Sequence, residues 1–307
     1  MSVEIARGVG PDRLDIAYER SGDSGSPPVL LLMGLGTQML GWPDGFCGAL
    51  VGQGLHVIRS DNRDIGLSSH VSDAPAPDLA AIFRGDTSSA SYTLSDMAGD
   101  TVGLLDALRL ESAHLVGASM GGMIAQTVAI EHPRRVRSLT SIMSSTGDPS
   151  VGQSTREAVA ALLSPPATTR AEAIERTLAI LRVIGSPGFE LDEADVRRRT
   201  GLAFDRAHDP VGVARQLAAI AASGDRTAAL RSVSVPTLVL HGADDPLVNV
   251  SGGRATARAI PGAELVVLDG MGHHLPRELW AEIARHIADV VTRAEAETEA
   301  GGAVRRQ

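Results

Sequence analysis

One serine is surrounded by small residues in a way that points to covalent chemistry. Ser119 lies in GASMG (117–121), which has the form G-x-S-x-G, between an apolar run (113–118) and a helix-like stretch. In that context the motif is typical of a nucleophile on a sharp strand-to-helix turn. The turn strains the serine backbone, and strand and helix come close together, so the neighbours must be small. The pattern predicts that Ser119 is a nucleophile rather than an ordinary turn serine.

A serine nucleophile needs a histidine base, and the base needs a carboxylate that orients it. Both should follow Ser119 in the order acid, then histidine. Asp244 and Asp245 follow one apolar run, and His273 and His274 follow the next. Open α/β sheets place their chemistry just past such strand ends. Adjacent residues point in different directions, so only one member of each pair can face the serine.

Other residues offer alternatives to this triad. Asp148 follows the apolar stretch 138–145 and is a competing acid. The set His241, Asp244 and Asp245 would allow a metal site, but no H-E-x-x-H or comparable cluster supports one. We expect no metal and no cofactor. Three further histidines are interpreted as structural or exposed: His114, His132 and His286.

The rest of the chain indicates which elements must position these residues. Apolar runs typical of strands alternate with helix-like stretches, which predicts an α/β fold with a mostly parallel sheet and helices on both faces. The expected strands are 14–19, 29–33, 55–59, 113–118, 138–145, 236–242 and 263–270. Helices are expected after Pro43, from Thr93 to about Leu108, after Ser119, near 251–260 and over 276–291.

The alternation stops between two of these strands. Residues 146–232 have helical patterns broken by prolines, so we expect a helical cap inserted into a core made of residues 1–145 and 233–292. Residues 293–307 have the composition of a disordered tail. The cap arginines are expected on a solvated helix face: Arg197, Arg198, Arg199, Arg206 and Arg215.

Composition excludes several classes of function. The 307 residues carry a net charge of −9, which argues against nucleic acid or an acidic membrane surface as partner. All 28 basic residues are arginine, so Schiff-base chemistry is excluded. The single cysteine, the lack of an apolar leader and the lack of a membrane-spanning stretch predict a cytoplasmic protein without a stable membrane anchor.

Three segments together resemble the α/β-hydrolase-fold serine hydrolases: GWPDGFCGALVGQGLHVIRSDNRDIGLSS (41–69), VGASMGGMIAQ (116–126) and DGMGHHLP (269–276). The resemblance covers about residues 12–292 and is greatest to actinobacterial esterases and lipases, including the aclacinomycin methylesterase type. It implies that Asp245, the fourth residue of G-x-x-D, is the acid and that His273 is the base. It also implies an oxyanion hole made by the backbone N–H groups of Leu35 and Met120.

Two other motifs bear on this resemblance. Met33-Gly34 stands where many relatives have His-Gly, a change that the esterases just named can share. Asp61-x-Arg63-x-x-Gly66-x-Ser68 matches a family loop, which we interpret as a structural brace at the sheet edge.

The residues and the resemblance agree on a serine hydrolase that cleaves a carboxylic ester of a largely apolar small molecule or lipid through an acyl-enzyme. A thioesterase, an acyltransferase or a perhydrolase on the same triad would look alike. A non-catalytic ligand-binding protein is the alternative from another class. The sequence leaves the physiological ester and the oligomeric state open.

Overall fold

A computed structural model describes residues 2–304. Over this range the chain forms one eight-stranded sheet in the order β1-β2-β4-β3-β5-β6-β7-β8. The strands are β1 (Glu4–Val9), β2 (Leu14–Ser21), β3 (Pro28–Leu32), β4 (His56–Ser60), β5 (Ala113–Ala118), β6 (Val136–Ile142), β7 (Thr237–Gly242) and β8 (Glu264–Leu268).

The sheet is parallel from β4 through β8, whereas β1 and β2 are antiparallel to their neighbours. This confirms the predicted mostly parallel sheet. The alternation of the sequence did not indicate β1. That strand lies at the sheet edge and pairs only with β2, and most of its side chains are exposed or partly exposed. An edge strand of this kind has only a weak apolar pattern.

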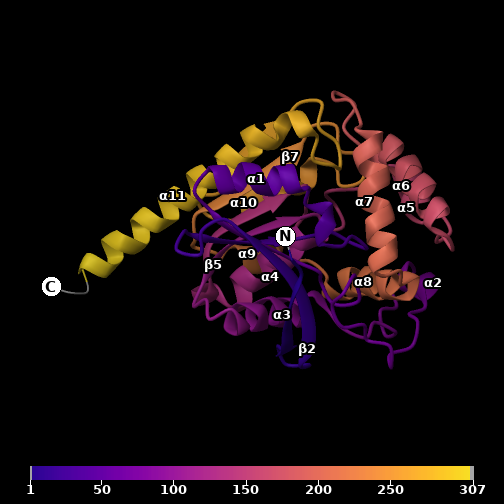
Figure 1. Cartoon of the computed structure of the whole chain (residues 1–307), viewed down its shortest axis with the longest axis horizontal. Helices are drawn as coiled ribbons and strands as arrows, with labels where there is room; N and C mark the ends of the chain where they lie inside the picture. The colour runs from indigo at the N-terminus through magenta and orange to yellow at the C-terminus, as the bar shows by residue number, and fades with distance from the viewer. Residues whose placement is uncertain (1, 305–307) are drawn as a thin grey trace.

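Helices cover both faces of the sheet, as predicted. On one face α1 (Asp44–Gly52) packs against α11 (Trp280–Val304). On the other face lie α3 (Leu94–Ala107), α4 (Met120–Glu131) and α10 (Ser251–Ala259). The start of α3 is fixed by the predicted capping box, in which Thr93 and Asp96 satisfy each other's backbone N–H groups. Figure 1 shows α1 and α11 above the sheet and α3 below it.

Residues 146–232, which we call the cap segment, form helices only. They are α5 (Arg156–Leu162), α6 (Arg170–Ile184), α7 (Glu193–Arg206), α8 (Pro210–Ser223) and α9 (Thr227–Leu230). No strand occurs between β6 and β7 in this described stretch. Helices α5 to α8 stand together at one side of the sheet (Figure 1). The remaining elements are a short helix α2 (Leu79–Ile82) and three 3₁₀ turns, η1 (Met39–Gly41), η2 (Pro133–Arg135) and η3 (Arg277–Leu279).

The expected disordered tail is wrong for most of its length. Helix α11 continues through Val304, and only residues 305–307 of the expected tail lie outside the described residues. Two observations explain the continued helix. Ala294 is buried, and the Glu295 carboxylate accepts hydrogen bonds from buried His114 and from Arg137. The low apolar content that predicted disorder therefore belongs to a helix that is held at its buried side.

The expected solvated face is also wrong for two cap arginines. Arg197 and Arg198 are about half exposed and pair with acids of α6 and α7. Arg206 instead reaches Asp61 at 2.9 Å, and the buried Arg215 reaches Asp64 at 2.8 Å. Both carboxylates are fully buried in the loop after β4. A run of charged residues on a helix does not reveal which side chains face the core. Arg206 and Arg215 face it, and they bind the cap segment to the core.

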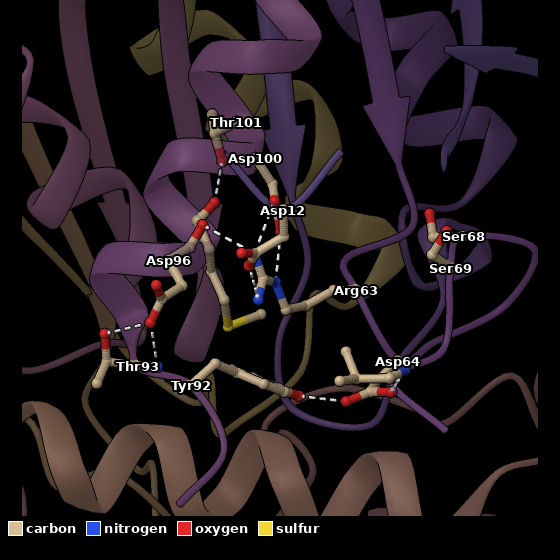
Figure 2. A network of polar contacts seen from close by, with 12 residues as sticks. Asp12, Arg63, Asp64, Ser68, Ser69, Tyr92, Thr93, Asp96, Asp100 and Thr101 are labelled. Atoms are coloured by element: carbon tan, nitrogen blue, oxygen red, sulfur yellow. Dashed lines mark hydrogen bonds and ion pairs between the residues drawn. The ribbon is translucent and has the colours of Figure 1, made fainter. Parts of the chain in front are cut away.

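The loop after β4 braces the sheet edge, but not through a pair between Asp61 and Arg63. Asp61 accepts the backbone N–H groups of Met39 and Leu67 at 2.7 and 3.0 Å. Arg63 pairs with Asp100 at 2.6 Å and with Asp12 at 3.0 Å, as Figure 2 shows.

None of the helices in the described residues combines the length and the apolar character that a membrane span requires.

Candidate active site

The nucleophile motif forms the sharp turn that its sequence predicts. Ser119 stands between β5 and α4 with φ 56° and ψ −121°, a strained conformation for a residue with a side chain. Its backbone N–H donates to the carbonyl of Ile142 at 2.9 Å, and its carbonyl accepts the hydroxyl of Ser144 at 2.8 Å. The turn is therefore held on both sides by the neighbouring strand β6 and the residues after it.

Glycines make this turn possible. A Cβ on Gly117 would meet the backbone of Gly121, and a Cβ on Gly121 would meet the carbonyl of Leu32 at the end of β3. Neither backbone can move aside without moving a strand or a helix. The small residues around Ser119 are thus required by close contact of backbone with backbone.

The predicted base lies beside this serine. The Nε2 atom of His273 is 3.0 Å from Ser119 Oγ, and its Nδ1 atom is 2.7 Å from Asp245 Oδ2. An ionised carboxylate can only accept, so Nδ1 carries the proton and Nε2 accepts the serine hydroxyl. Ser119, His273 and Asp245 therefore form one continuous chain of hydrogen bonds, with the tautomer that lets the imidazole remove a proton from the serine.

Asp245 is held as an ionised, fixed carboxylate. It is 3% exposed, and its Oδ1 accepts the backbone N–H groups of Leu247 and Val248, both at 2.9 Å. Burial opposes its ionisation, but the charge of His273, the imidazole of His241 3.5 Å away, the hydrogen bond from His273 and the Val248 N–H together hold the pKa of Asp245 well below its usual range. The carboxylate can orient and stabilise an imidazolium without taking its proton.

The competing residues point elsewhere. Asp244 accepts the backbone N–H of Gly270 at 2.9 Å and so ties the ends of β7 and β8 together. Asp148 accepts hydrogen bonds from the backbone and the hydroxyl of Ser150 at an exposed turn. His241 Nε2 donates to the carbonyl of Val248 at 2.7 Å, behind the acid.

The two predicted oxyanion donors belong to segments that adjoin Ser119. Leu35 follows Gly34, where a Cβ would stand 3.1 Å from Ser119 Cβ and 3.6 Å from its Oγ. Met120 directly follows the nucleophile as the first residue of α4. Among the described residues, neither backbone N–H group donates a hydrogen bond to a protein acceptor. This arrangement leaves both donors free for an oxygen beside Ser119.

The cap segment holds the loop that carries His273. The carbonyl of Ile184 accepts the His273 N–H at 2.7 Å, and Ser186 Oγ accepts the Gly272 N–H at 3.0 Å. A Cβ on Gly272 would meet the carbonyl of Gly185. Gly188, three residues after Gly185, and Gly270, two residues before Gly272, are in a similarly close backbone contact and share a hydrogen bond of 2.9 Å. The two segments are therefore packed backbone against backbone.

His274 points toward the cap segment instead of the nucleophile. Its Nδ1 is 2.9 Å from the hydroxyl of Ser186. Burial, and secondly the positive charge of Arg199, lowers the pKa of His274 to about 4. A neutral His274 at ordinary pH adds no positive charge next to His273.

Metal ligation has little support in these side chains. In residues 2–304, the ligand atoms of Asp64, His70 and Asp209 lie close enough together to hold a metal ion. The ligand atoms of His241, Asp244 and Asp245 do not form such a group. Arg215 forms two hydrogen bonds with Asp64 and stands 3.6 Å from Asp209. A cation there would have to compete with a guanidinium.

Sequence reasoning missed the residues that hold the site from outside. Ser144 supports the nucleophile turn, Ser186 supports the histidine loop, and Gln216 contacts the loop of Leu35. All three are ordinary polar residues without a motif. Only Ser144 had a usable signal, because it follows the strand next to the nucleophile strand.

Comparisons with known proteins agree with this geometry. The family model for the alpha/beta hydrolase fold matches residues 27–276. The rhodomycin D methylesterases of Streptomyces peucetius and of Streptomyces sp. (strain C5) are each 30% identical, with 90% and 92% of this chain and 94% and 96% of theirs covered. The crystal structure of the enol-lactonase from Burkholderia xenovorans LB400 is 26% identical with a TM-score of 0.70, covering 91% of this chain and 97% of that one. The chain belongs to the α/β-hydrolase family.

Proposed function

We propose that this protein hydrolyses a carboxylic ester through an acyl-enzyme formed on Ser119, with His273 as general base and acid and Asp245 as the orienting carboxylate. One observation carries the proposal. Ser119 Oγ is 3.0 Å from His273 Nε2, while His273 Nδ1 is 2.7 Å from Asp245. The two methylesterase relatives independently support a carboxylic ester hydrolase.

Acylation begins when Ser119 Oγ attacks the ester carbonyl carbon and its proton moves to His273 Nε2. The carbonyl electrons become an oxyanion, which the backbone N–H groups of Leu35 and Met120 stabilise. Loss of one such donor typically costs about 2.7–4 kcal/mol of transition-state stabilisation. The tetrahedral intermediate then collapses, the C–O bond to the alcohol breaks, and His273 gives its proton to the departing oxygen.

Deacylation repeats these steps with water. His273 Nε2 takes a proton from the water as its oxygen attacks the acyl carbon. The second intermediate collapses, the bond to Ser119 Oγ breaks, and the proton on His273 returns to the serine. Asp245 keeps the imidazole in one tautomer throughout and stabilises its charged form. The products are the carboxylic acid and the alcohol, and the enzyme is regenerated.

For the substrate, we propose an ester with a largely apolar body, and a methyl ester is the first candidate because both Streptomyces relatives are methylesterases. The enol-lactonase relative fits the same chemistry, since a lactone is a cyclic ester. The cap segment is rich in alanine and leucine, which favours an apolar group.

The decisive experiment is active-site labelling with a fluorophosphonate, followed by peptide mass spectrometry. We expect one adduct, on Ser119. The Ser119→Ala variant should fold normally, take no label and lose hydrolysis of p-nitrophenyl esters. An adduct on Ser144 or Ser145 would contradict the assignment.

A substrate panel then tests the ester class. Methyl, ethyl and p-nitrophenyl esters with apolar acyl groups of increasing size are compared with the matching thioesters, with release of acid as the readout. We expect ester hydrolysis. Activity confined to thioesters, or transfer to an added alcohol without hydrolysis, would replace the proposal with a thioesterase or an acyltransferase.

A further inference from the structure

The loop that carries the proposed oxyanion donor Leu35 is a tight turn. The backbone N–H of Thr37 donates to the carbonyl of Gly34 at 3.2 Å, and Gly36 has φ +65°. That carbonyl belongs to the same peptide plane as the Leu35 N–H, and the two groups point in opposite directions. The aim of the Leu35 N–H thus depends on the shape of the turn 34–37.

One cap side chain is bonded to the middle of this turn. Gln216 lies on α8 and is fully buried. Its Oε1 accepts the backbone N–H of Gly36 at 2.9 Å, and its Nε2 donates to the carbonyl of Arg63 at 2.8 Å. The first bond fixes the peptide plane between Leu35 and Gly36, which directly follows the plane of the oxyanion donor.

The second bond fixes which way the Gln216 amide faces. The carbonyl of Arg63 can only accept, so the NH₂ group must face it and the oxygen must face Gly36. Arg63 is itself held through its guanidinium by Asp12 and Asp100 (Figure 2). The oxygen that receives the Gly36 N–H is therefore placed by a chain of contacts anchored in the core.

We propose that Gln216 is a positioning residue for the oxyanion hole. By holding the Gly36 N–H from the cap segment, it keeps the turn 34–37 in the one shape that aims the Leu35 N–H at the substrate oxygen. This inference rests on the proposed acyl-transfer function. It predicts that loss of Gln216 weakens the transition state more than the bound substrate, because the oxyanion forms only in the transition state.

The test uses full-length Gln216→Met, which keeps the side-chain volume and removes both hydrogen bonds, and Gln216→Glu, which keeps an acceptor for Gly36. Ser223→Ala is the matched control. Ser223 lies on the same helix and accepts the Leu94 N–H at 2.8 Å, another bond between cap segment and core. The readouts are kcat and KM for a p-nitrophenyl ester and Ki for an aryl trifluoromethyl ketone, whose adduct with a serine carries an oxyanion.

For Gln216→Met we expect kcat to fall about tenfold, Ki to rise by about the same factor and KM to change less than about twofold. Gln216→Glu should recover most of the ketone affinity, although it leaves the Arg63 carbonyl unpaired. Ser223→Ala should leave kcat and Ki near the wild-type values. If Gln216→Met does not fold, Gln216→Asn, whose amide is one methylene shorter, provides the same comparison.

Two results would overturn the inference: a Ki for Gln216→Met equal to that of the wild type, or the same changes in KM, kcat and Ki for Gln216→Met and for Ser223→Ala. Either would reduce Gln216 to a packing role. Failure of the proposed function looks different, since the wild type itself would then neither hydrolyse esters nor bind the ketone.

Discussion

The nucleophile turn at 117–121 and the oxyanion loop at 34–38 stand side by side but are stabilised in different ways. The nucleophile turn is fixed from within the core, by glycines packed on backbone and by the hydroxyl of Ser144. The oxyanion loop is fixed in addition by hydrogen bonds to the cap segment. Gln216 holds Gly36, and the Gln38 amide donates to the carbonyls of Ala203 and Ala207 at 2.7 and 3.0 Å.

This difference separates two requirements of the same reaction. The turn that carries Ser119 is held by core contacts, so it should survive changes in the cap segment. The loop of the proposed base His273 is bonded to the cap segment through Ile184 and Ser186. The part that stabilises the oxyanion depends on both the core and the cap segment. Arg206 strengthens that dependence, because it donates to Gln38 Oε1 at 2.7 Å and to Asp61 at 2.9 Å.

The largest expected effect lies wholly on the core side. Asp245→Asn should lower kcat by about 10⁴-fold, because an amide favours the wrong tautomer of His273. The neighbouring Asp244→Asn is the control and should cost far less, since the Asp244 carboxylate accepts the Gly270 N–H and not a proton of His273. Steady-state kinetics of the two variants decides the matter. A collapse of kcat in Asp244→Asn, with near-normal kcat in Asp245→Asn, would reverse the assignment.

A smaller effect is expected where the cap segment is bonded to the core. Arg206→Met leaves the fully buried Asp61 without its cation and should lower the free energy of unfolding by about 3 kcal/mol. Arg197→Met on the same helix removes an exposed pair with Glu175 and should cost less than about 1 kcal/mol. Urea unfolding measures both. Equal losses would show that Arg206 does not bind the cap segment to the core.

A glycine substitution tests whether close backbone contact shapes the nucleophile turn. Gly121→Ala places a methyl group against the carbonyl of Leu32 and should cost about 2 kcal/mol of stability. Gly48→Ala in α1 meets no atom within 4 Å and should be neutral or slightly stabilising. The midpoints of thermal unfolding give the comparison. A tolerated alanine at Gly121 would mean that close backbone contact does not shape the turn.

The last expected effect, of similar size, concerns acid sensitivity at the junction of the cap segment and the histidine loop. The pKa of His274 is lowered to about 4, so the folded state disfavours its protonation. The unfolded chain takes up this proton below about pH 6.5, and stability should therefore fall as the pH drops from about 6.5 toward 4.

Replacing His274 tests this directly. Between pH 7 and pH 5 the group accounts for about 2 kcal/mol of lost stability, from the two pKa values. Urea unfolding of His274→Asn at both pH values should show a loss smaller by that amount, whatever the variant's stability at pH 7. An unchanged difference would mean that His274 is not enclosed by the cap segment.

The sequence predicted the nucleophile turn well and the contacts between the cap segment and the oxyanion loop poorly. The turn at Ser119 is shaped by residues within a few positions of it, so a short motif predicted it. Asp245 and His273 each follow a strand, which predicted their neighbourhood, and the family resemblance selected them over Asp244 and His274.

The bonds from the cap segment could not be predicted in this way. Gln216 lies 180 positions from Gly36, and Arg206 lies 145 positions from Asp61. Nothing in the spacing of polar residues on an amphipathic helix tells which one will meet a backbone N–H on another element. The continuation of α11 past residue 292 was missed for the same reason, since Glu295 finds its partners on β5 and β6.

The close contact between Gly185 and Gly188 on one segment and Gly270 and Gly272 on the other limits which caps could replace the one in this chain. At these four positions the junction has no room for a side chain. A grafted cap will fit this core only if it brings small residues at both of its junction positions, however well its helices suit the new substrate.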